Sequence, residues 1–97
     1  MREPIYRETG HPKTLMHASD AGGGVIAPAP SSGSIVIYSI LASAASTLKE
    51  TDTSGDVVAY APAGCSTLAG GLKITDQKAV FNDTSSNVTV LYTIVDG

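Results

Sequence analysis

From residue 34 onward the sequence consists of short runs rich in β-branched residues, separated by turn residues about every 8 to 12 positions. This spacing is typical of a sandwich or barrel, and it predicts an all-β fold. We expect a small antiparallel β-sandwich, jelly-roll-like or immunoglobulin-like, with about six or seven short strands. The expected strands cover 34–42, 46–52, 57–61, 66–68, 72–75, 79–82 and 87–95.

The first and last of these runs are apolar on both faces. In 87–95, Val88, Val90, Tyr92 and Ile94 alternate with Thr89, Leu91, Thr93 and Val95. In 34–42, alternation places Ile35, Ile37, Ser39 and Leu41 opposite Val36, Tyr38, Ile40 and Ala42. We therefore expect the two runs to pair as central strands, with surplus apolar surface left for oligomerisation or docking.

Turn residues mark the connections between these runs. The segments 53–56 and 82–87 contain Asn, Asp, Ser and Gly, whose side chains or conformational freedom favour turns. Gly70 and Gly71 are expected to form a turn with positive φ before a strand that starts at Leu72.

Residues 1–33 have a different texture, because they hold most of the prolines and the run Gly22-Gly23-Gly24. Proline lacks a backbone donor and restricts the preceding residue, so helix and central strand are disfavoured across this stretch. The sequence therefore predicts an extended amino-terminal arm and linker over 1–33 and a sandwich domain over 34–97, with the three glycines as a hinge.

The charge pattern argues against nucleic acid as a partner. Six Lys and Arg oppose nine Asp and Glu, for a net charge of −3, and no basic stripe is present to neutralise phosphates. No apolar run approaches the roughly 18 residues of a membrane helix. The start of the chain also lacks the apolar stretch of a secretory signal, so we expect synthesis in a cytoplasm and no membrane partner.

Residues with catalytic or metal-binding chemistry do not form a recognisable set. Cys65 is the only cysteine, which excludes an intramolecular disulfide, and we expect it to be a semi-buried small apolar residue. The only histidines, His11 and His17, lie in the predicted arm, and the spacing of His17 and Asp20 is a weak metal signal. No nucleophile elbow is present. We therefore expect no catalytic, cofactor-binding or metal-binding residues, and no enzyme activity.

The order of the sandwich segments resembles a family of short virion proteins of tailed bacteriophages. Its members have a Ser- and Ala-rich first hairpin, a Ser-Gly turn before a valine strand, an Ala-Gly turn, a Gly-Leu strand and a closing Val-Thr-Val strand. The likeness covers about two thirds of the chain. The matching segments are Ile35-Val36-Ile37-Tyr38, Ala42-Ser43-Ala44-Ala45-Ser46, Thr53-Ser54-Gly55-Asp56-Val57-Val58, Ala63-Gly64-Cys65-Ser66, Gly70-Gly71-Leu72-Lys73-Ile74 and Asn87-Val88-Thr89-Val90-Leu91-Tyr92.

This resemblance implies a role in a tailed-phage particle, as a capsid decoration (cement) protein, a minor capsid protein, or a neck or tail component. The leading interpretation is a decoration protein, which docks on the major capsid protein and stabilises the head. A homo-oligomer, with a trimer favoured, is implied as well. An extended arm could form many contacts with neighbouring subunits, and its expected anchors are Ile5, Tyr6, Leu15 and Met16, with Arg2 and Arg7 for charged pairs. Two alternatives stay open: a neck, tail or fibre component, and a receptor- or glycan-binding module that would use Tyr38, Tyr60 and Tyr92.

Overall fold

The computed structural model describes residues 15–95, which form eight β-strands and no helix. The strands are β1 (Met16–Asp20), β2 (Val25–Ala27), β3 (Ser34–Ala42), β4 (Ser46–Glu50), β5 (Val57–Ala61), β6 (Gly64–Lys73), β7 (Val80–Asn82) and β8 (Val88–Val95). The predicted all-β class is confirmed, and the predicted runs 34–42 and 57–61 coincide with β3 and β5.

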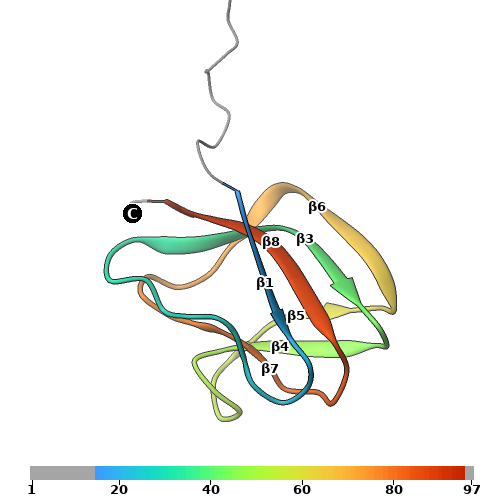
Figure 1. The fold of residues 1–97 in the computed structure, drawn as a ribbon. Helices are drawn as coiled ribbons and strands as arrows, with labels where there is room; N and C mark the ends of the chain where they lie inside the picture. The colour runs from blue at the N-terminus through green and yellow to red at the C-terminus, as the bar shows by residue number, and fades with distance from the viewer. Residues whose placement is uncertain (1–14, 96–97) are drawn as a thin grey trace, which may run out of the picture.

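The strands form two packed antiparallel sheets with the orders β1-β8-β3-β6 and β2-β7-β4-β5 (Figure 1). The first half of the chain pairs with the second half in reverse order: β1 with β8, β2 with β7, β3 with β6, and β4 with β5. This is a long hairpin rolled into a sandwich, which is the topology of a jelly roll. Of the two expected topologies, the immunoglobulin-like one is therefore excluded, because its strands follow a different order.

The expected central pair is confirmed, because β3 and β8 lie side by side between β1 and β6. The two expected strands 66–68 and 72–75 are instead a single strand, β6. Gly70 and Gly71 do have positive φ, of 80° and 83°. They produce an irregularity in the pairing with β3 and do not reverse the chain.

The domain boundary in the structure differs from the expected one because of residues 16–27. They were expected to belong to an arm and linker, but they form β1 and β2 of the two sheets, so the expected start of the sandwich at residue 34 is wrong. β1 pairs with β8 along its whole length, from Met16 opposite Tyr92 to Asp20 opposite Val88. Such pairing stabilises strands whose local sequence has little strand preference. Pro28 and Pro30 follow β2, where no ladder donor is required.

A bulge in β3 decides which side chains reach the core. Ile37 pairs with Tyr92 and Ser39 pairs with Leu91, so Tyr38 is an extra residue on β3. Because side chains alternate along a strand, one extra residue exchanges the two faces beyond it. The expected faces are therefore wrong after Tyr38: Ile40 is buried, whereas Leu41 is 55% exposed.

The core lies between the sheets and consists mainly of aliphatic side chains. Fully burying such a side chain contributes about 1.5–3 kcal/mol. The predicted core residues Val88, Val90 and Tyr92 are buried, while Ile94 is exposed close to the end of β8. The largest fully buried apolar side chains are Ile35, Ile37, Ile40, Leu48, Ile74, Val80, Val88 and Val90.

A polar network fastens the turns at one end of the sandwich. The Asp20 carboxylate accepts hydrogen bonds from the backbone N–H groups of Gly22 and Gly24, at 2.9 and 3.0 Å. The buried Asn82 amide donates to this carboxylate, at 3.2 Å, and to the Ser86 carbonyl oxygen, at 2.8 Å. The predicted glycine hinge is thus a fastened turn between β1 and β2.

Candidate docking surface

The outer face of the β1-β8-β3-β6 sheet is uncharged where two rows of side chains cross the sheet. Residues opposite each other in antiparallel strands share a face, so the strand register identifies its members. Two rows cross all four strands, and neither contains an acidic residue, Lys or Arg. We call this surface the hydroxyl face; its rows are Ser19, Thr89, Leu41, Cys65 and His17, Leu91, Ser39, Thr67.

Leu41 is the most exposed aliphatic side chain of the hydroxyl face. It pairs with Thr89 on one side and Cys65 on the other. Its position follows from the bulge at Tyr38, which turns Leu41 away from the core. Covering such a side chain on binding would remove apolar surface from water, which is favourable by about 25 cal/mol per Å².

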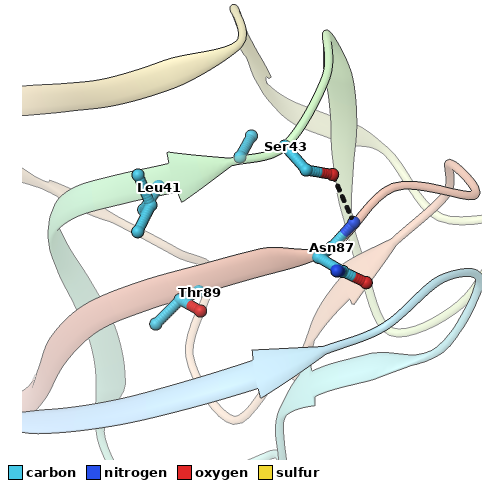
Figure 2. Close-up of a pocket in the computed structure, with 5 residues that line it drawn as sticks. Leu41, Ser43, Asn87 and Thr89 are labelled. Atoms are coloured by element: carbon cyan, nitrogen blue, oxygen red, sulfur yellow. Dashed lines mark hydrogen bonds between the residues drawn. The ribbon is translucent and has the colours of Figure 1, made fainter.

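A shallow depression of about 280 Å³ lies at one end of this face, where β3 ends and β8 begins. Figure 2 shows Leu41 and Thr89 on its two neighbouring strands and a hydrogen bond between Ser43 and Asn87 at its end. The Asn87 N–H donates to Ser43 Oγ at 2.9 Å, and the Ser43 N–H donates to the Asn87 carbonyl oxygen at 2.9 Å. Its lining residues are Leu41, Ala42, Ser43, Asn87 and Thr89.

This depression offers contacts and no acid–base chemistry. Its lining has hydroxyl, amide and methyl groups but no titratable side chain, and its volume is at the lower limit of small-molecule pockets, roughly 300 Å³. Within residues 15–95, no three His, Cys, Asp or Glu side chains come close enough together to hold a metal ion.

Two acidic residues have a lowered pKa, and both lie away from this face, around the turn between β4 and β5. Hydrogen bonds from the Ser54 side chain and backbone lower the pKa of Asp52. The pKa of Asp83 is lowered by the hydrogen bond from the Thr53 hydroxyl and then by Lys49, whose Nζ lies 2.9 Å from a carboxylate oxygen. These contacts hold the turn in place, and the predicted turn at 53–56 is confirmed.

Four of the expected arm anchors, Arg2, Ile5, Tyr6 and Arg7, lie outside the described residues. The other two lie at the start of the sandwich. Leu15 is exposed just before β1, and its role as an anchor stays a prediction. Met16 is half-buried, pairs with Tyr92 and packs against the core, so it contributes to the sandwich itself.

Cys65 differs from its expectation, because it is exposed and not semi-buried. It lies on β6, an edge strand, and belongs to the outer face through its pairing with Leu41. The sequence signal for this face was the apolar character of both sides of β3 and β8. That signal could not identify Leu41, since the alternation pattern does not reveal a bulge.

The tyrosines on which the glycan-binding alternative depends do not gather in one groove. Tyr92 is buried and faces the core. Tyr60 is 77% exposed, but it lies on β5 of the other sheet. Tyr38 is half-buried at the bulge of β3. No observation in the described residues therefore favours an aromatic sugar site.

Comparison with known proteins identifies no relative of this chain. No protein-family model, curated protein or solved structure matches the chain. In residues 15–95 there is also no helix that could span a lipid bilayer.

Proposed function

We propose that this chain is a structural protein of a tailed-bacteriophage particle, a capsid decoration protein that docks on the major capsid protein. The observation that carries the proposal is the hydroxyl face, an uncharged surface of the β-sandwich on which Leu41 is exposed. The resemblance of its segments to small virion proteins supplies the identity of the particle. Jelly rolls also occur in viral capsid proteins, which supports the proposal by analogy of architecture alone.

The hydroxyl face is suited to a protein partner in a multivalent shell. Burying it against another protein does not require the removal of charged groups from water, which costs several kcal/mol per ion. Its Ser and Thr hydroxyl groups can both donate and accept, so they can match a varied polar surface. Leu41 supplies exposed apolar surface, and its removal from water on binding is favourable.

The amino-terminal residues join the sandwich beside this face, because β1 is an edge strand of the same sheet. In this proposal Ile5 and Tyr6 extend the contact beyond the sandwich, with Arg2 and Arg7 at its margin. Deleting residues 1–14 leaves the eight strands described in residues 15–95 intact, whereas deleting 1–20 would remove β1.

The first experiment is quantitative mass spectrometry of density-purified particles from cells that carry the gene. We expect the chain in hundreds of copies per particle. Six or twelve copies would contradict a head decoration protein and indicate the neck or tail. Absence from the particles would overturn the proposal altogether.

The second experiment measures saturable binding of the purified chain to particles that lack it. Leu41→Lys places a charge in the hydroxyl face and should weaken binding at least tenfold, and deletion of 1–14 should weaken it as well. The matched control is Val25→Lys, since Val25 is similarly exposed, at 48%, on the other sheet. Equal loss in the control, or unchanged binding of Leu41→Lys, would contradict docking through this face.

A further inference from the structure

The strands β5 and β6 form one open side of the sandwich. Each is the last strand of its sheet, β5 in β2-β7-β4-β5 and β6 in β1-β8-β3-β6. Only Pro62 and Ala63 connect them, so the two edges lie on the same side of the molecule. On that side each strand has no further neighbour within residues 15–95.

This side lacks the charges with which edge strands are usually protected. Not one Asp, Glu, Lys or Arg occurs from Val57 to Leu72, a stretch that holds all of β5 and all of β6 except Lys73. Exposed edges with free backbone groups pair readily with other chains, and proteins block this with charges, prolines or very short strands. In β6 the irregularity at Gly70 leaves the segment 64–67 regularly paired to β3.

The opposite side of the sandwich has those protections. β2 has three residues and is followed by Pro28 after Ala27. β1 is five residues long and ends in Asp20, whose carboxylate binds the following turn. The contrast is clearest for β6, which has ten residues and no charge before Lys73, whereas β5 has five residues and is followed by Pro62. The long uncharged edge of β6 is therefore the one that most invites cover by another chain.

Exposed apolar side chains accompany the unprotected edges. On β5, Tyr60 is 77% exposed and Val57 is 42% exposed, and both lie on the outer face opposite residues of β4. On β6, Cys65 is exposed. Aromatic side chains such as Tyr60 are enriched in protein interfaces, where they bury a large area at a small entropic cost.

We propose that a second copy of this chain covers the open side, with β5 and β6 each pairing antiparallel with its own counterpart across a twofold axis. Such an axis makes the interface self-complementary. Each strand lies antiparallel to its copy in the second molecule, and the backbone N–H and C=O groups of the two strands can form hydrogen bonds with each other. The charges favour this occupant. Pairing about a twofold axis brings each residue of 57–72 close to the same segment of the second copy, where like charges would repel each other, and this segment contains no charged residue. A charged partner would find no ion to pair with there.

The test is the mass of the full chain in solution, measured by light scattering with size-exclusion chromatography under reducing conditions. We expect a concentration-dependent species of twice the 9.9 kDa chain mass. The double variant Tyr60→Lys, Thr67→Lys places a charge on each edge and should raise the dissociation constant at least tenfold. The control is Val25→Lys, Ser19→Lys, on the edge strands β2 and β1 of the other side.

Circular dichroism must show that both double variants unfold cooperatively like the parent chain. A parent chain that stays monomeric at several hundred micromolar would overturn the proposal. A trimer would overturn the twofold pairing, and equal dissociation of the control would show that the contact lies elsewhere. Because this measurement uses no particles, its failure leaves the proposed docking on a capsid untouched.

Discussion

Gly70 and Gly71 in β6 have nearly the same φ angle but different surroundings, which makes them a matched pair. Their φ angles are 80° and 83°. A Cβ added at Gly70 would meet nothing within 4 Å. At Gly71 it would lie 2.4 Å from Val36 Cγ1 and 3.1 Å from Tyr38 Cε1. Comparing alanine at the two positions therefore separates backbone strain from the close approach of β6 to the bulge of β3.

The expected losses in the free energy of unfolding follow from these two contributions. An alanine in the left-handed region costs about 1–2 kcal/mol, partly offset by about 0.4–1 kcal/mol from the stiffer unfolded chain. Gly70→Ala should therefore destabilise by roughly 1 kcal/mol. Gly71→Ala adds the cost of overpacking, about 1–3 kcal/mol, for a total of roughly 2–4 kcal/mol. For a domain of this size the second change should lower Tm by roughly 10–25 °C.

Thermal and urea unfolding followed by circular dichroism measure both losses. A third variant, Gly71→Ala with Val36→Ala, removes the methyl group that the new Cβ would meet. We expect a favourable coupling of about 0.5–3 kcal/mol between the two substitutions, as is usual for residues in contact. Equal destabilisation by Gly70→Ala and Gly71→Ala, together with no coupling to Val36, would refute the packing of Gly71 against β3.

Three further predictions concern the core, the polar network and the response to acid. Leu48→Ala in the core should cost about 2–5 kcal/mol in urea unfolding, and a loss below 1 kcal/mol would contradict its full burial. Asn82→Ala leaves the buried Ser86 carbonyl and the half-buried Asp20 carboxylate without this donor, so it should destabilise by about 1–3 kcal/mol, more than the exposed control Asn87→Ala. The pKa of Asp83 is lowered in the folded state below 3.8, so its contribution is complete above the unfolded pKa and is lost as pH falls through the folded pKa. Asp83→Asn should thus flatten the decline of Tm below about pH 4, and an unchanged decline would contradict the contact with Thr53.

Much of the strand content follows from local sequence patterns. The runs that became β3, β5 and β8 combine β-branched residues with adjacent turn residues, and their positions could be read directly. Pairing of β3 with β8 could also be inferred, because only central strands tolerate apolar residues on both faces. The strands β1 and β2 could not, since they are short segments among glycines and prolines. Their stability comes from pairing with β8 and β7.

The sequence predicted the candidate surface only in part. Apolar residues on both faces of β3 predicted a docking surface, but they placed Leu41 on the wrong side. The reversal arises at Tyr38, where β3 has one residue more than β8; at the same point β6 departs from regular pairing with β3 between Thr67 and Leu72. A bulge depends on how adjacent strands fit together and leaves no mark in the alternation of one strand. The exposure of Cys65 likewise depends on β6 being an edge strand.

The sequence by itself determined that the chain is all-β, where most strands and turns lie, and that the segment from Val57 to Leu72 is free of charge. These are local properties, set by the alternation of side chains and by the conformational preferences of turn residues. Only the tertiary structure decided that β1 and β2 complete the sandwich, that Leu41 faces outward, and that the uncharged segment forms one open side. Strand order and register arise from contacts between residues far apart in the chain, and no short stretch of sequence contains them.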